Sequence, residues 1–343
     1  MKIFLFITTF LFGGGDMLFY AAKPVTIFSE KIELSGSVYY PSGDGPFPAV
    51  VMIHGSEYGV KKNFKDYAKF FARNGIVTLT YDKRGCGESG GDYLTSDFVD
   101  LAKDVVAAVE KLKHDPLVDS NRIGLWGISQ GTWIELLADS LSSDISFLIN
   151  VSGPAMTPAE HTLYALRKDM EADGFGESTI QNFLHIQQKL LRYFHDRKNW
   201  SEIVQHLSLL LLDQEARSAY DKGYLQHWID LAGRGDQLPS LDKVKLNPWI
   251  RHHTFDPMPL YQNLSTPILL VYGTNDEVID VETSVRRLLP IVKPASQLMI
   301  YPNAGHQMKI NRFPGLFFSP VFPDGYLETM AAFIKNQSTE KQP

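Results

Sequence analysis

One serine of this sequence stands where hydrolytic chemistry would need it. Ser129 lies two residues from Gly127 on one side and Gly131 on the other, which gives the pattern G-x-S-x-G. Residues 122–127 have the apolar character of a buried strand, and 132–138 have that of a helix. A serine on a tight strand-to-helix turn is lifted above the sheet, and the glycines let the two backbones approach closely. The pattern therefore predicts Ser129 as a nucleophile.

A serine hydroxyl is a poor nucleophile unless a base removes its proton and an acid orients that base. Asp276 follows the apolar stretch 267–272, and His306 follows the stretch 297–301. Both stretches are expected to be strands, so both residues should lie at the same edge of the sheet as Ser129. The order serine, acid, histidine also fits this topology. Two further carboxylates compete for the role of the acid: Glu277 and Asp280.

Backbone amides are needed to stabilise the oxyanion that forms when a serine attacks a carbonyl. The amide of Gln130 is expected at the first turn of the helix after Ser129, where N–H groups are free to bind an anion. A second amide should come from the turn after the strand 49–53. We expect Ser56 to supply it, with Glu57 as the alternative. His54 is expected to hydrogen-bond this loop rather than to carry protons.

Strands and helices alternate along most of the chain, which indicates a mostly parallel sheet with helices on both faces. Residues 31–40 are expected to form an edge strand. Short apolar runs predict further strands at 49–53, 76–81, 122–127, 145–151, 267–272 and 297–301. Apolar residues at three- and four-residue steps predict helices at 63–74, 98–112, 132–138 and 326–334.

The alternation breaks in one long segment. From 156 to 256 the pattern is helical throughout, and the strand pattern resumes after it. This arrangement favours a helical cap at 156–256 inserted into one α/β core made of 23–155 and 257–343. A separate helical domain is the alternative.

Five motifs stand in the order found in the α/β-hydrolase superfamily. They are HGSE (54–57), YDKRGCGESGG (81–91), GISQG (127–131), GTNDEVID (273–280) and NAGH (303–306). The sequence most resembles the acyl-esterase, serine-aminopeptidase and prolyl-oligopeptidase-like branch. The resemblance implies the α/β-hydrolase fold. Within the glycine-rich loop 82–91, Asp82 and Arg84 are expected to form a structural ion pair.

The overall composition excludes several classes of function. The net charge is −6 and the pI is near 5.9, and no stripe of basic residues interleaves with aromatic ones, so nucleic-acid binding is not expected. The single cysteine, Cys86, excludes an internal disulfide and a thiolate metal site within one chain. The adjacent His252 and His253 cannot both point into one site from regular structure. We expect no metal and no cofactor.

The first residues have the layout of a signal peptide. Lys2 precedes an apolar run over residues 3–12, followed by three glycines. The run is too short to span a membrane, which requires roughly twenty apolar residues. We therefore predict a signal peptide at 1–22 and export to the periplasm or the medium, with a cytoplasmic protein as the alternative.

These observations predict a serine hydrolase that acts on carboxylic esters through Ser129, His306 and Asp276. A peptidase or aminoacyl amidase with the same residues is the first alternative, and a non-catalytic ligand-binding protein of the same fold is the second. The expected partner is a small ester or a short peptide.

Overall fold

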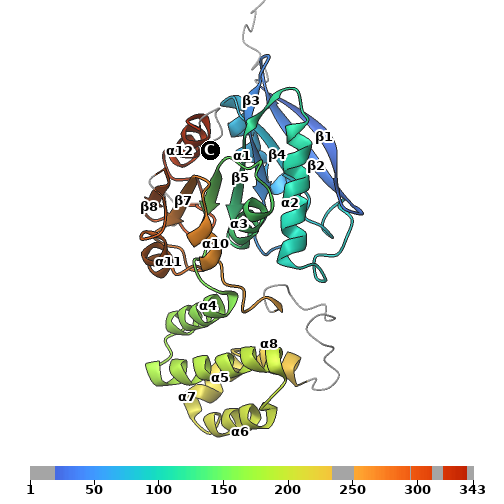
Figure 1. Ribbon diagram of the computed structural model, residues 1–343. Helices are drawn as coiled ribbons and strands as arrows, with labels where there is room; N and C mark the ends of the chain where they lie inside the picture. Colours follow the sequence, from blue (N-terminus) through green and yellow to red (C-terminus); the bar gives the residue numbers. More distant parts are fainter. Residues whose placement is uncertain (1–19, 234–250, 294, 311–319, 338–343) are drawn as a thin grey trace, which may run out of the picture.

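The fold is built on one sheet of eight strands. The computed structural model describes residues 20–233, 251–293, 295–310 and 320–337 (Figure 1). The strands are β1 (Tyr20–Ser29), β2 (Ile32–Pro41), β3 (Phe47–Ile53), β4 (Val77–Tyr81), β5 (Val118–Ile128), β6 (Leu148–Val151), β7 (Ile268–Gly273) and β8 (Gln297–Tyr301). Their order is β1-β2-β4-β3-β5-β6-β7-β8. The pairs β1–β2 and β2–β4 are antiparallel, and every pair from β4 to β8 is parallel.

Helices cover both faces of this sheet. They are α1 (Lys65–Arg73, preceded by the 3-10 turn Lys61–Phe64), α2 (Phe98–Lys113), α3 (Gln130–Leu141), α10 (Met258–Asn263), α11 (Val281–Leu288) and α12 (Tyr326–Lys335). Alternate residues of β3 face opposite sides, as strand geometry requires. Val51 packs with residues of α2 and α3, whereas Val50 packs with residues of α1 and α12. The predicted α/β-hydrolase fold, a mostly parallel sheet between two helical layers, is confirmed.

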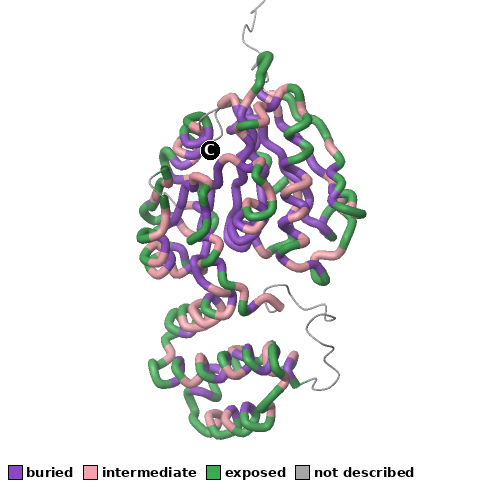
Figure 2. The backbone as a smooth tube through the Cα atoms, viewed as in Figure 1, coloured by how far each residue is buried: buried purple, intermediate pink, exposed green. Residues whose placement is uncertain are grey.

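A separate group of helices lies between β6 and β7 in the sequence. They are α4 (Pro158–Ala172), α5 (Glu177–Asp196), α6 (Trp200–Leu210), α7 (Gln214–Asp221) and α8 (Gln226–Ala232). These helices share an apolar cluster of their own, to which Phe183 and Leu190 of α5 and Ile203 of α6 belong. Figure 2 shows most of the buried residues within the sheet and its helices, with a smaller group among α5–α8. Residues 234–250 of the predicted cap lie outside the described residues.

The predicted edge strand at 31–40 is wrong in its position. β2 occupies this segment, but β1 pairs with it along its whole length, from Tyr20 opposite Pro41 to Ser29 opposite Ile32. β1 is therefore the edge strand. Sequence patterns missed it because most of its side chains are exposed or half-buried, so no apolar run marks it.

Of the predicted signal peptide, only residues 20–22, at the start of β1, are among the described residues. The predicted signal-peptide boundary at residue 22 falls inside β1, and residues 1–19 lie outside the described residues. Among the helices that the structure describes, none combines the length and the apolar character that crossing a membrane would require.

The ion pair expected between Asp82 and Arg84 does not form. Arg84 instead binds Asp104 of α2 through two hydrogen bonds of 2.7 and 2.6 Å. The Asp82 carboxylate accepts from the backbone N–H groups of Lys61, at 2.6 Å, and Glu88, at 2.9 Å. The partner of Arg84 is twenty residues away in the sequence, so only the packing of α2 against the loop could reveal it.

Candidate active site

Ser129 lies on a strained turn between β5 and α3. Its backbone angles are φ 54° and ψ −124°, a combination that residues with a side chain rarely adopt. The two flanking glycines are required by close contacts. A Cβ atom on Gly127 would lie 2.6 Å from the carbonyl oxygen of Gly131, and one on Gly131 would lie 2.7 Å from that of His54. The predicted strand–turn–helix context of the serine is therefore present.

His306 and Asp276 form a direct pair at the carboxyl ends of β8 and β7. The Nδ1 atom of His306 lies 3.0 Å from Oδ2 of Asp276. The other carboxylate oxygen accepts from the backbone N–H groups of Val278 and Ile279, each at 2.9 Å. These two amides fix the carboxylate, and the carboxylate fixes the plane of the imidazole.

The two competing carboxylates are placed differently. Asp280 accepts from the backbone N–H of Thr283 and thereby caps α11. Glu277 is exposed to solvent. Of the three candidates, Asp276 is the one hydrogen-bonded to His306.

Ser129 and His306 line the same small pocket. The pocket has a volume of about 190 Å³, and its other lining residues are Ser56, Glu57, His161, Val278 and Gln307. Within the described part of the chain, the Ser129 hydroxyl has no hydrogen bond to His306. Such catalytic hydrogen bonds are often long before the substrate binds and shorten in the complex. The chain thus brings the serine, the histidine and the acid to one rim of the sheet.

Two backbone amides border this pocket. Ser56 follows β3, and Gln130 is the first residue of α3. The first turn of a helix leaves its N–H groups without intrahelical partners and carries a partial positive charge. Neither the Ser56 nor the Gln130 amide donates to another residue that the structure describes. Both are therefore free to bind a negatively charged oxygen.

His54 has a structural role beside the pocket. Its Nε2 atom lies 2.8 Å from the carbonyl oxygen of Tyr81, to which it donates, and its ring stacks on Phe64 at 4.4 Å. Burial lowers the pKa of His54 to about 3, so the ring is neutral at physiological pH. This is the role that the sequence analysis favoured.

His161 is a pocket residue that the sequence analysis missed. It lies on α4, is 9% exposed, and lines the pocket beside Ser129 and His306. Burial, and to a lesser extent the charge of His306, lowers the pKa of His161 to about 4. No motif surrounds it, so in the sequence it is a single histidine on an amphipathic helix. Only the placement of α4 beyond the carboxyl ends of the strands brings it to the site (Figure 1).

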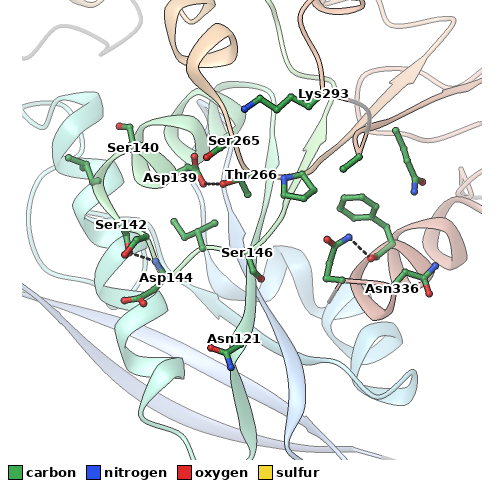
Figure 3. Close-up of a pocket in the computed structure, with 18 residues that line it drawn as sticks. Asn121, Asp139, Ser140, Ser142, Asp144, Ser146, Ser265, Thr266, Lys293 and Asn336 are labelled. Carbon is green, nitrogen blue, oxygen red and sulfur yellow. Dashed lines mark hydrogen bonds between the residues drawn. The ribbon is translucent and has the colours of Figure 1, made fainter. Parts of the chain in front are cut away.

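A larger hollow lies at the opposite ends of the same strands. It has a volume of about 920 Å³ and is lined mainly by polar residues that precede β6, β7 and β8 or end α3 (Figure 3). Thr266 donates to the carboxylate of Asp139 at 2.6 Å, and Ser265 lies beside this pair. Among the described residues that line the hollow there is no histidine. Its serines therefore have no neighbouring imidazole to act as a base.

A family comparison extends these observations to most of the chain. The family model described as X-Pro dipeptidyl-peptidase (S15 family) matches residues 30–304. The chain belongs to the S15 family. The matched range includes Ser129 and Asp276 and ends two residues before His306.

Individual relatives of this S15 chain are esterases by name. Esterase EstD of Thermotoga maritima is 30% identical over 167 residues, which cover 46% of this chain and 39% of that protein. Esterase FrsA of Shigella boydii is 32% identical over 130 residues, which cover 38% of this chain and 30% of that protein. The chain thus spans well under half the length of these curated relatives.

Solved structures share the fold of this S15 chain over nearly its whole length. The Pyrococcus furiosus esterase Pf2001 has a TM-score of 0.56 and is 19% identical, with 93% of this chain and 92% of that chain covered. The α/β hydrolase GrgF from Penicillium has a TM-score of 0.56 at 19% identity, with 93% and 98% covered. At this level of identity the similarity demonstrates the fold and leaves the function to be argued from the site.

Proposed function

We propose that the protein is a serine hydrolase that forms an acyl-enzyme on Ser129. The observation that carries the proposal is the pocket in which a strained serine lies beside a histidine held by a buried carboxylate. Nucleophile, base and orienting acid are the three groups that acyl transfer by a serine requires.

In the proposed reaction His306 removes the proton of Ser129 as the hydroxyl oxygen attacks the substrate carbonyl. The carbonyl oxygen becomes an oxyanion, which accepts hydrogen bonds from the amides of Ser56 and Gln130. His306 then gives its proton to the leaving group, and the bond between the carbonyl carbon and that group breaks. Water, deprotonated by His306, attacks the acyl-enzyme; the bond to the Ser129 oxygen breaks, that oxygen takes the proton back from His306, and the acid is released.

Asp276 acts through His306. Its carboxylate accepts the Nδ1–H of the imidazole, so that Nε2 is the basic nitrogen and is available to Ser129. The amides of Val278 and Ile279 hold the carboxylate in that position. The negative charge also stabilises the imidazolium that forms in the transition state.

Carboxylic esters are the proposed substrates. The curated relatives that the sequence matches include esterases by name, and the pocket is small and lined largely by polar residues. The pocket suits a short acyl group better than a long aliphatic chain. Helices α4–α8 are proposed to form the cap, with α4 placing His161 in the pocket.

A second candidate is a peptidase that cleaves after an X-Pro unit. The description of the matching family, X-Pro dipeptidyl-peptidase, is the observation that favours it. The same serine, histidine and amides would serve either reaction, because ester and amide hydrolysis share the tetrahedral intermediate.

A substrate panel with covalent labelling tests this proposal. Nitrophenyl esters with acyl chains of two to twelve carbons are compared with X-Pro nitroanilides, and kcat/KM is measured for each. We expect turnover of the short-chain esters and attachment of a fluorophosphonate to Ser129, located by mass spectrometry. Preferential cleavage of the nitroanilides would favour the peptidase. A lack of both labelling and turnover would favour a non-catalytic binding protein.

A further inference from the structure

A buried lysine lies directly behind the proposed oxyanion amide. Lys83 follows β4 and is only 4% exposed. Its Nζ donates to the carbonyl oxygens of Gly55, at 2.5 Å, and Glu57, at 2.8 Å. These are the carbonyls on either side of Ser56 in the loop after β3. One ammonium group therefore fixes two peptide units of that loop.

Tyr93 also contacts the loop after β3. Its hydroxyl oxygen lies 3.0 Å from the carbonyl oxygen of Ser56 and 3.1 Å from the side-chain amide of Gln130. The hydroxyl proton of Tyr93 has two acceptors here, the carbonyl oxygen of Ser56 and Oε1 of Gln130, so the phenol bridges these two residues. The ammonium group of Lys83 lies 4.2 Å from the centre of the Tyr93 ring, within the range of a cation–π interaction.

Because peptide groups are planar, hydrogen bonds to these carbonyls also fix the direction of the N–H groups that follow them. In a trans peptide the C=O and the following N–H lie in one plane and point in opposite directions. The bond from Lys83 to the carbonyl of Gly55 therefore sets the direction of the Ser56 N–H. The bond from Tyr93 to the carbonyl of Ser56 sets that of the Glu57 N–H in the same way. Both candidates for the second oxyanion amide are thus oriented by this pair.

Stability alone is a weak explanation for a lysine in this position. Burial disfavours the charged form and lowers the pKa of Lys83 to about 8. Removing a charge from water costs free energy that offsets much of what its hydrogen bonds contribute to stability. The carbonyl contacts of Lys83 are therefore better explained by a requirement of the site.

We propose that Lys83 and Tyr93 are positioning residues that aim the two candidate amides, those of Ser56 and Glu57, and link their loop to Gln130, which carries the other oxyanion amide. The inference rests on the proposed hydrolase function and assigns to the loop 81–91 a part in stabilising the oxyanion. Neither side chain is among the residues that line the pocket. Both act through the backbone of the loop after β3.

Tyr93→Phe is the mildest test, because it removes only the hydroxyl. We expect kcat for the best ester to fall about tenfold with KM unchanged, since misaligned donors weaken transition-state binding alone. A trifluoromethyl ketone that matches this ester forms an oxyanion on Ser129, and its affinity should fall by the same factor. Tyr40→Phe is the control. It also removes a partly buried tyrosine hydroxyl that donates a hydrogen bond, here to Asp115, but this bond lies away from the pocket.

Lys83→Met separates positioning from stability. We expect a loss of kcat larger than that of Tyr93→Phe, because two carbonyls of the loop lose their shared donor; kcat is measured on the folded protein at a temperature below the thermal midpoint of the variant. Lys61→Met is the control, because Lys61 binds Ser35, Asp82 and Glu88 at the same loop but no carbonyl of residues 55–57. If Lys83→Met does not fold, the Tyr93→Phe measurements decide the question.

The proposal is overturned if Tyr93→Phe keeps the kcat and ketone affinity of Tyr40→Phe. It is also overturned if Lys83→Met loses stability but its folded fraction keeps full kcat. The pair would then stabilise the fold without affecting catalysis. Failure of the hydrolase proposal has a different signature: Ser129→Ala would retain turnover. An inactive Ser129→Ala beside a fully active Tyr93→Phe removes the positioning role alone.

Discussion

The two ends of the parallel strands carry hollows of very different size and chemistry. The hollow at the amino ends has about five times the volume of the pocket at the carboxyl ends, and it is lined by several serines. The smaller pocket holds the serine with strained backbone angles and the histidine bound to Asp276. Volume and hydroxyl content therefore do not identify the site; the groups around the hydroxyl do.

One helix explains much of this difference. α3 begins at Gln130, beside the small pocket, and ends at Leu141, which lines the large hollow. A helix presents free N–H groups and a partial positive charge at its first turn, and free carbonyls and a partial negative charge at its last. An oxyanion is stabilised at the first end and destabilised at the second. A serine of the large hollow would lack both an imidazole among the described lining residues and a place for the developing charge.

Serine substitutions at the two ends should differ most. Ser129→Ala is expected to reduce kcat for the best ester by about four to six orders of magnitude, because the nucleophile is lost. Ser265→Ala, in the large hollow, should leave kcat unchanged. Steady-state kinetics on both variants checks the comparison, and equal losses in the two would contradict the proposed site.

Carboxylate substitutions should give the next largest contrast. Asp276→Asn is expected to lower kcat by about three to four orders of magnitude, because an amide stabilises the wrong tautomer of His306. Asp139→Asn, whose parent carboxylate accepts from Thr266, should retain full kcat. If Asp276→Asn keeps wild-type kcat while circular dichroism shows a folded protein, the orienting role of Asp276 is refuted.

The dependence of stability on pH should have opposite signs at the two ends. Burial lowers the pKa of His54 from 6.5 to about 3, so below pH 6.5 the unfolded chain binds a proton here that the folded chain does not. Acid therefore destabilises the fold through His54. From pH 6.5 to 5, His54→Gln should gain about 2 kcal/mol of unfolding free energy relative to the wild type.

Asp139 should act in the other direction and more weakly. Burial raises its pKa from 3.8 to about 6, so the folded chain binds a proton below pH 6 that the unfolded chain does not bind until near pH 3.8. From pH 7 to 5, Asp139→Asn should therefore lose about 1 kcal/mol relative to the wild type. Urea unfolding at the three pH values measures both effects. Slopes of the same sign for the two variants would show that one of these environments is misassigned.

Local sequence patterns were sufficient to predict the buried strands of the sheet and the main candidate residues of the site. The apolar runs at 49–53 and 267–272 appear as β3 and β7, and Asp276 and His306 follow strands as expected. Buried strands of a parallel sheet are apolar on both faces, so they stand out in a sequence. β1 did not stand out because it is an exposed edge strand whose side chains satisfy no apolar period.

Contacts between distant segments escaped the sequence for a different reason. Arg84 was expected to pair with Asp82, yet its partner is Asp104 on α2. His161 reaches the pocket only because α4 lies beyond the carboxyl ends of the strands. Lys83 and Tyr93 donate hydrogen bonds to three backbone carbonyls that lie some thirty residues earlier in the sequence. Sequence spacing gives no information about which side chains meet across such separations.

The sequence by itself determined the order of the buried strands along the chain, the turn that carries Ser129, and the loops that carry Asp276 and His306, because these depend on local periodicity and on glycine at close approaches. The tertiary structure alone decided which carboxylate binds the histidine, which residue of α4 enters the pocket, and which side chains hold the loop that carries Ser56. Those features depend on distances between segments that only the packed sheet brings together.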